Sequence, residues 1–234
     1  MVEGLGIMRR LNITLTLLVA LVLGACSQGN QITPLHQQVL QAGQQIIASK
    51  RNPQGERPPL TRAVLDAVEV SYIEAVVERR DALAYLHVDT ILQDQQPGQI
   101  TVWRTDDNVA LIMRNGVLIA TRGLGGDLLS AEVPVASNQS GPAHSGAHVM
   151  HLRTGANHQR SLSLACDLSD LGAEMVVIVE QSYDTRHLQQ RCSGGGGEVV
   201  NDYWVDSRAG LVWKSRQWAG PQIGYIRFRR LTTG

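Results

Sequence analysis

Histidine is the most concentrated chemically active residue type in this chain. Four histidines fall within fifteen residues, at His144, His148, His151 and His158. Imidazole is a common metal ligand, but residues 142–160 contain no Cys, Asp or Glu to complete a coordination shell, and the chain has no H-E-x-x-H motif. The Ser-Gly dipeptide at 145–146 disfavours a helix that would align the first two. We interpret the run as solvated loop histidines and expect neither a physiological metal nor a cofactor.

A glycine-rich loop, Gly123-Leu-Gly-Gly-Asp127, follows an expected strand, as phosphate-binding loops do. It lacks the Lys-Ser/Thr pair of a P-loop, and the surrounding sequence lacks the alternating strands and helices of a dinucleotide site. A tight turn or bulge that needs positive φ is the simpler interpretation. Because Arg122 and Asp127 flank the glycines, the loop could still present a charged pair to a ligand, and both residues are candidates for a binding surface.

Nucleophilic catalysis has no local signal in the sequence. Neither a Gly-x-Ser-x-Gly elbow nor a Ser-x-x-Lys pair occurs. The adjacent carboxylates of Asp106 and Asp107 fit a turn better than a general acid and base. We expect a protein that is not an enzyme. A periplasmic hydrolase stays open as an alternative if scattered Ser, His and Asp residues, or a carboxylate pair, converge in the folded chain.

The most distinctive aromatic and charged residues lie near the C-terminus. A period of two places Leu211, Trp213, Ser215 and Gln217 on one face of a strand, and Val212, Lys214, Arg216 and Trp218 on the other. The first face is expected to meet the core. The second sets two cations beside an indole, which suits cation–π stacking or an acidic, flat ligand such as a sugar acid. Trp204, Lys214, Arg216 and Trp218 are therefore candidates for a ligand or partner surface. Structural packing of Trp and Arg at a sheet edge is the alternative.

The N-terminal segment predicts export. Arg9-Arg10 precede the apolar stretch Leu11–Leu23, which has the length of a secretory signal and is too short for a good membrane-spanning helix. The next residues, Leu23-Gly-Ala-Cys26, resemble the bacterial lipobox, in which the cysteine is diacylated and becomes the first residue of the mature protein. We expect a signal peptide over 1–25 and a lipidated tether over 26–33, although an ordinary signal peptide with a chance cysteine stays open. Under the usual sorting convention, Ser27 favours the outer membrane, with the protein facing the periplasm.

Charge and cysteines fit an exported domain. Without residues 1–25 the chain carries 21 − 2 = 19 basic and 21 − 1 = 20 acidic residues, a balance that gives no bulk reason to expect nucleic-acid binding. Two cysteines remain besides Cys26. In an oxidising compartment we expect Cys166 and Cys192 to form a disulfide, worth about 3 kcal/mol in the chain-entropy model. Cys166 shares the apolar face of a strand, so the bond should be structural and face the core.

The rest of the chain reads mainly as antiparallel β structure. An amphipathic helix is expected over Pro34–Lys50 and a brief helical turn over Thr61–Ala67. Most of 133–157 reads as loop with a short strand near His148–Leu152, and Gly194–Gly197 as a flexible link. The expected strands are Ser71–Val77, Ala82–Thr90, Ile100–Arg104, Val109–Met113, Val117–Thr121, Ser161–Leu168, Glu174–Tyr183, Asn201–Val205, Leu211–Trp218 and Ile223–Leu231. These patterns favour one all-β domain over 34–234, a large sheet of about ten strands that folds over on itself into a half-open barrel or corner.

Three separated motifs resemble the YjbF/GfcB lipoproteins of group 4 capsule and exopolysaccharide loci. They are Thr121-Arg-Gly-Leu-Gly-Gly-Asp-Leu128, Asn201-x-Tyr-Trp-Val-Asp206 and Trp213-Lys-Ser-Arg-Gln-Trp-x-Gly-Pro221. The resemblance covers about 60–231 and implies an eleven-stranded, partly closed sheet. It also implies a role in producing or exporting surface polysaccharide, with the glycan or a secretion protein as partner and the membrane reached through acyl groups. It brings no catalytic residues. A periplasmic lipid or lipoprotein carrier is the alternative function.

Overall fold

The computed structural model describes residues 60–155, 158–195 and 197–233. The expected signal peptide, the lipidation site Cys26 and the helix expected over Pro34–Lys50 lie outside the described residues. Within them, the structure has no apolar helix long enough to cross a membrane.

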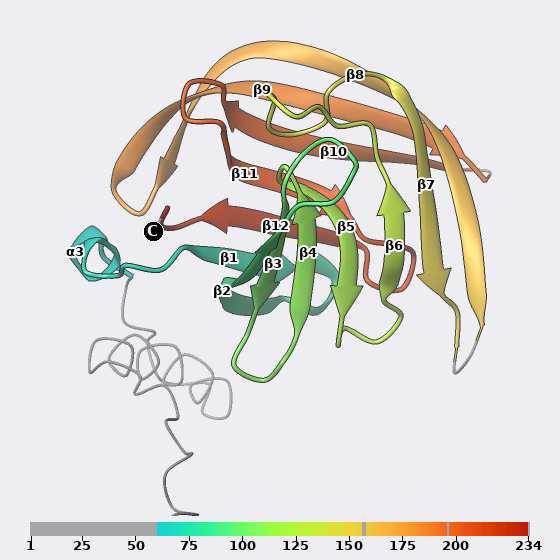
Figure 1. Ribbon diagram of the computed structural model, residues 1–234, viewed down its shortest axis with the longest axis horizontal. Helices are drawn as coiled ribbons and strands as arrows, with labels where there is room; N and C mark the ends of the chain where they lie inside the picture. The colour runs from blue at the N-terminus through green and yellow to red at the C-terminus, as the bar shows by residue number, and fades with distance from the viewer. Residues whose placement is uncertain (1–59, 156–157, 196, 234) are drawn as a thin grey trace, which may run out of the picture. The chain divides into compact units, whose positions relative to one another are not determined.

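Twelve antiparallel strands form one sheet that is nearly closed into a barrel (Figure 1). Their order across the sheet is β5-β4-β3-β2-β1-β12-β11-β10-β9-β8-β7-β6. The strands are β1 (Tyr72–Val77), β2 (Ala82–Leu92), β3 (Ile100–Arg104), β4 (Ala110–Arg114), β5 (Val117–Arg122), β6 (Leu128–Glu132), β7 (Gly146–Arg153), β8 (Gln159–Ile178), β9 (Gln181–Gly194), β10 (Gly197–Asp206), β11 (Leu211–Trp218) and β12 (Tyr225–Arg230). A short helix, α3 (Arg62–Asp66), precedes β1, and a single turn of 3-10 helix, η1 (Glu78–Arg80), joins β1 to β2.

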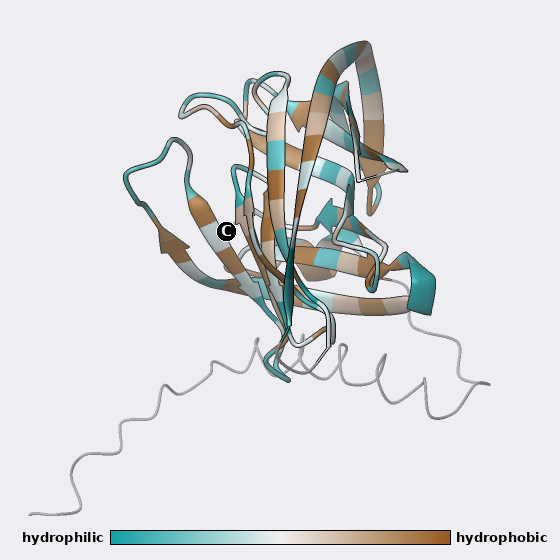
Figure 2. Ribbon diagram, turned by 90° about the vertical axis from the view of Figure 1, so that its right-hand side faces the viewer, coloured by the Kyte–Doolittle hydropathy of each residue, from teal (hydrophilic) through white to brown (hydrophobic). Residues whose placement is uncertain are grey.

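Alternating apolar residues build the core because successive side chains of a strand point to opposite faces of the sheet. Figure 2 shows this alternation along several strands as brown and teal bands. The main apolar cluster collects inward residues from strands across the sheet, including Leu86, Trp103, Met150, Ile226 and Phe228. Strand β1, in the middle of the strand order, is buried at every residue. A second, smaller apolar cluster includes Tyr203 and Val205.

The predicted all-β, mainly antiparallel fold is confirmed, and the strand count rises from about ten or eleven to twelve. The helical turn expected over Thr61–Ala67 appears as α3, and β11 has the predicted bounds. Strand β6 was not expected, and β7 is longer than the short strand predicted near His148–Leu152.

The largest correction concerns the β8–β9 hairpin. The strand expected over Glu174–Tyr183 is broken by a turn at Val179-Glu180, two non-glycine residues with φ of 44° and 68°. The segment before the turn belongs to β8, twenty residues long, and the segment after it begins β9. Gly194 and Gly197, interpreted from sequence as the ends of a flexible link, pair with each other where β9 turns into β10.

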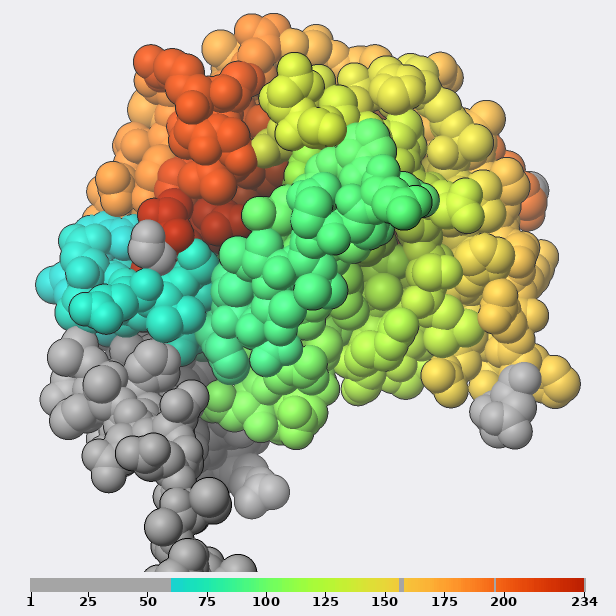
Figure 3. Space-filling model, in the orientation of Figure 1, coloured from blue at the N-terminus to red at the C-terminus, as the bar shows by residue number. Residues whose placement is uncertain are grey.

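The two outermost strands of the sheet, β5 and β6, are consecutive in the chain, and side chains connect them. The carboxylate of Asp127 is buried and accepts hydrogen bonds from the Thr121 hydroxyl at 2.9 Å and from the backbone N–H groups of Gly123 and Leu124 at 3.2 and 3.0 Å. The Thr121 hydroxyl oxygen in turn accepts from the backbone N–H of Leu128. In the space-filling view the green and yellow-green surfaces of these segments adjoin (Figure 3).

Arg122 strengthens the same junction. Its guanidinium donates to the carbonyl oxygens of Thr121, Leu128 and Leu129 at 2.6, 3.2 and 3.1 Å. The edge strands of a sheet must be covered or paired. Unpaired backbone groups cost free energy when they are buried, and when exposed they can pair with strands of other chains. We call the junction formed by residues 121–129 the seam. It closes the sheet by side-chain contacts to backbone groups.

Substitution of Asp127 by Ala should destabilise the protein by about 2–4 kcal/mol, because three hydrogen bonds to a buried carboxylate are lost and their donors stay unpaired. Equilibrium unfolding in urea measures the loss. Asp127→Asn retains one side-chain oxygen as an acceptor and should lose less. An Asp127→Ala protein within 0.5 kcal/mol of the wild type would contradict the role given to the seam.

Candidate ligand-binding surface

The structure separates the six candidate surface residues. Arg122 and Asp127 lie in the seam, where their hydrogen-bonding groups are engaged with the backbone and with Thr121. Trp204, Lys214 and Arg216 lie on the outward face of β10 and β11, since Ser215 and Gln217 alternate with the last two and are buried. Trp218, at the end of β11, packs against the main apolar cluster. One surface therefore brings together three of the six.

An indole lies at the centre of this surface, between two neighbours from adjacent strands. Trp204 on β10 is paired in register with His187 on β9 and with Lys214 on β11. The His187 ring stacks on the indole with centroids 4.4 Å apart and planes 14° apart, and the Lys214 ammonium lies 3.9 Å from the ring centroid. These contacts leave Trp204 only 9% exposed. The ring thus supports the two polar groups that the surface presents.

Carboxylates hold the histidine in place. Nδ1 of His187 lies 3.1 Å from Glu174 on β8, and Nε2 lies 2.9 Å from Asp202 on β10. The side-chain amide of Gln189 donates to the same Asp202 oxygen at 3.0 Å. Because both ring nitrogens face carboxylates, neither is left to activate a hydroxyl nucleophile, which a hydrolase of the Ser-His type would need. The two carboxylates fix the orientation of the ring.

Arg216 is engaged differently from Lys214. Its guanidinium forms a two-point hydrogen-bonded pair with Glu78, at 2.9 and 2.8 Å, and lies 3.5 Å from the ring centroid of Tyr225. The hydrogen bond from Arg216 holds the pKa of the Glu78 carboxyl below its usual range. Bidentate pairs of this kind fix geometry strongly. Arg227 approaches Glu78 as well, at 3.5 Å.

Lys214 is the cation that this surface leaves available. Among the described residues it contacts the Trp204 ring but forms no ion pair with a carboxylate. The ammonium therefore offers hydrogen-bond donors to a ligand above an aromatic support. We call residues His187, Trp204, Lys214, Arg216 and Tyr225 the outer aromatic–cation surface. Its chemistry suits binding of an acidic group.

The histidine run requires a correction. His148 is not a solvated loop residue: it lies on β7, is 4% exposed, and neither ring nitrogen has a hydrogen-bond partner. Burial lowers its pKa to about 4. His151, also on β7, hydrogen-bonds Gln159 and Ser161 through Nδ1. Only His144 and His158 are exposed outside the strands, as expected.

The sulfur atoms beside His148 form the predicted disulfide. Cys166 on β8 and Cys192 on β9 are direct partners in the ladder, and both are buried in the main cluster. A ring nitrogen of His148 and both sulfur atoms lie within 4.8 Å of one another, a spacing that a metal could use. Since metal ligation requires thiolates, the disulfide removes two of the three ligands.

The fold is that of a class of antiparallel β proteins that includes a solved lipoprotein. The crystal structure of the hypothetical lipoprotein YmcC from Escherichia coli (K12) superposes with a TM-score of 0.63 at 20% sequence identity, covering 88% of this chain and 99% of that chain. No curated protein matches this sequence.

The sequence itself identifies the family. Residues 37–231 match the family described as group 4 capsule polysaccharide lipoprotein GfcB, YjbF. The match spans most of the chain, so the protein belongs to the YjbF family of capsule polysaccharide lipoproteins. The resemblance seen in the three motifs is thereby confirmed.

Acid should destabilise the protein through His148. A histidine whose folded pKa of about 4 lies below its unfolded value near 6.5 contributes stability that is present at neutral pH and lost as pH falls through that interval. The loss between pH 7 and pH 4 should be about 3 kcal/mol from this group. Urea unfolding across that range measures it. His148→Leu should flatten the slope, whereas the exposed His144→Leu should not; an unchanged slope in His148→Leu would refute the assignment.

Proposed function

We propose that this protein is an acylated outer-membrane lipoprotein that assists the production or export of surface polysaccharide without catalysing a reaction. Membership of the YjbF family carries the proposal, because the match extends over residues 37–231. The lipobox-like Leu23-Gly-Ala-Cys26 supports export and anchoring. A membrane anchor is useful to such a protein because it holds the domain beside the machinery that moves the glycan.

Binding through the outer aromatic–cation surface is the proposed mode of action. Aromatic rings with fixed cations are suited to sugar acids and to acidic patches of a protein partner. Lys214 supplies a charge without a carboxylate partner among the described residues, and Trp204 and His187 hold it in position. A glycan with carboxylate groups, or a secretion protein with an acidic face, fits this chemistry.

A lipid carrier is the weaker alternative. Binding sites for drug-sized and larger ligands commonly have volumes of roughly 300–1,000 Å³. One cavity in the described part of the barrel, beside Arg230, has a volume of about 20 Å³, far below that range. An acyl chain would require the core around Trp103 and Phe228 to open.

Deletion of the gene should lower the amount of surface polysaccharide under conditions in which the locus is expressed. Wild-type protein should restore it, and Cys26→Ala should not, because the anchor would be lost. Polysaccharide is quantified on intact cells, and immunoblotting checks that the variant accumulates. Unchanged polysaccharide in the deletion strain would contradict the proposed role. Full rescue by Cys26→Ala would contradict only the proposed need for the lipid anchor.

Charge reversal at Lys214 tests the surface. Lys214→Glu should reduce polysaccharide several-fold in the complemented strain, because the available cation becomes an anion. Arg208→Glu is the matched control: this arginine lies in the β10–β11 turn, 83% exposed, outside the aromatic–cation surface. Thermal unfolding should show both variants folded. Equal polysaccharide in the two strains would exclude this surface as the binding site.

A further inference from the structure

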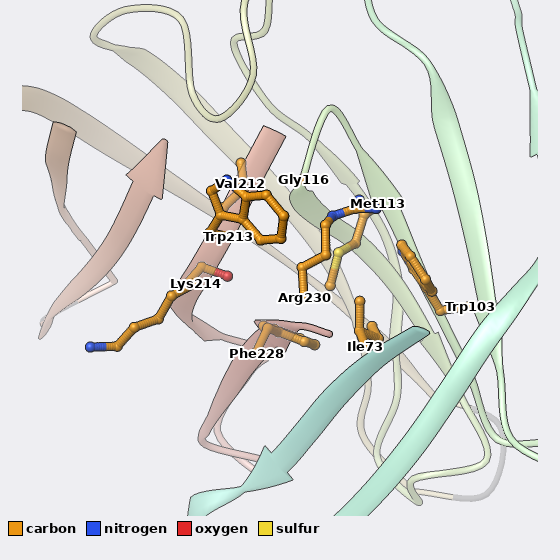
Figure 4. Close-up of a pocket in the computed structure, with 10 residues that line it drawn as sticks. Ile73, Trp103, Met113, Gly116, Val212, Trp213, Lys214, Phe228 and Arg230 are labelled. Atoms are coloured by element: carbon orange, nitrogen blue, oxygen red, sulfur yellow. The ribbon is translucent and has the colours of Figure 1, made fainter. Parts of the chain in front are cut away.

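Arg230 points into the barrel, whereas Arg216 points outward. Arg230 ends β12 and shares the inward face with Ile226 and Phe228, two residues of the main cluster. It is the direct partner of Ile73 in the β1–β12 ladder. Figure 4 shows its side chain among Trp103, Met113 and Trp213. A guanidinium is thus placed in an apolar, aromatic interior.

Arg230 has no anionic partner among the described residues. Its Nε is buried without a hydrogen-bond partner, and its recorded contact is with the Trp103 ring, 5.1 Å from the centroid. The adjacent Arg229, by contrast, points outward and forms a two-point pair with Glu74. Burial lowers the pKa of Arg230 to about 10, so the group stays charged at neutral pH. A buried, uncompensated charge is expensive.

A small cavity with a mainly apolar lining lies beside this guanidinium. Its volume is about 20 Å³, enough for one or two waters or the oxygens of one carboxylate group. None of its lining residues is acidic. Ser215 also lines it. Its oxygen accepts from Gln217, and among the described residues its hydroxyl hydrogen has no acceptor. Arg230 as a whole is only partly buried.

We propose that this cavity binds a carboxylate group, with Arg230 as its counter-ion, Ser215 as a second donor, and the rings of Trp103 and Trp213 beside it. A planar carboxylate matches the planar guanidinium fork. A phosphate is larger and carries more charge than one guanidinium and one hydroxyl satisfy. The choice of a sugar acid as the source of the carboxylate rests on the proposed role with polysaccharide. The proposal of a carboxylate site does not depend on that role.

Titration of the full-length protein in mild detergent tests the site. Trp103 and Trp213, two of the four tryptophans, line the cavity, so intrinsic fluorescence should report binding. The probes are sodium glucuronate, sodium acetate, glucose and sodium chloride, at constant ionic strength set with sulfate. Glucuronate should bind saturably and raise the melting temperature, whereas glucose should do neither.

Three variants assign the binding to the cavity. Arg230→Gln should weaken glucuronate binding at least tenfold, and Arg230→Lys, which keeps the charge but loses the fork, should weaken it less. Arg227→Gln, on the exposed face of the same strand, is the matched control and should bind as the wild type does. If Arg230→Gln fails to fold, the melting-temperature response of the wild type and of Arg230→Lys decides the question.

The remaining outcomes separate the parts of the proposal. Equal affinity for glucuronate in Arg230→Gln, or no saturable binding by the wild type, overturns the site. Chloride binding as tightly as glucuronate overturns carboxylate recognition. Acetate binding as tightly as glucuronate overturns the sugar assignment and supports the carboxylate site. A gene deletion that leaves the amount of surface polysaccharide unchanged would refute the proposed function but would not affect these binding results.

Discussion

Closure of the sheet is the constraint on which the remaining structure depends. A row of twelve strands has two edges, and here they are β5 and β6, which follow one another in the chain. The buried carboxylate of Asp127 gathers three donors around the connecting loop, and Arg122 caps carbonyl groups beyond it. With the edges joined, the inward faces of the strands enclose the main apolar cluster.

Charged side chains have different partners on the outer face of the sheet and in its interior. On the outer face, carboxylates and guanidinium groups meet in pairs. Glu74 on β1 pairs with Arg229 on the neighbouring β12, and Glu78 in η1 pairs with Arg216 on β11. These pairs order the surface and leave Lys214 as the cation with an aromatic support but no carboxylate among the described residues. In the interior, Arg230 has an indole and a small cavity in place of a carboxylate. Lys214 and Arg230 thus share one feature: each contacts an indole ring and has no carboxylate partner among the described residues.

Sequence reasoning succeeded where turns carry their usual residues. Asn115-Gly116 has positive φ at both positions, and the hairpin it predicts between β4 and β5 is present. It failed where the turn chemistry is unusual: Val179-Glu180 adopts positive φ without glycine or asparagine, so an apolar run continues through the bend and hides the β8–β9 hairpin. His187 went unnoticed with it, because its strand was not recognised.

The interior arginine could have been found. Alternation along Ile226-Arg-Phe-Arg-Arg230 puts its last residue on the apolar face, a position that an arginine occupies only for a reason. The pairing of Trp204 with His187 and Lys214, by contrast, depends on registers between strands, which no local pattern specifies. Local chemistry predicted most elements, and the site arose from their alignment.

The order of the strands also has a kinetic meaning. Of the eleven neighbour pairs in the sheet, ten join strands that are consecutive in the chain, and the remaining one joins β1 to β12. Two meanders, β1–β5 and β6–β12, can therefore assemble from short-range contacts, whose loop-closure entropy is small. Their union through the β1–β12 ladder requires residues about 150 positions apart to meet. That single long-range step, rather than the number of strands, should govern how fast the barrel forms.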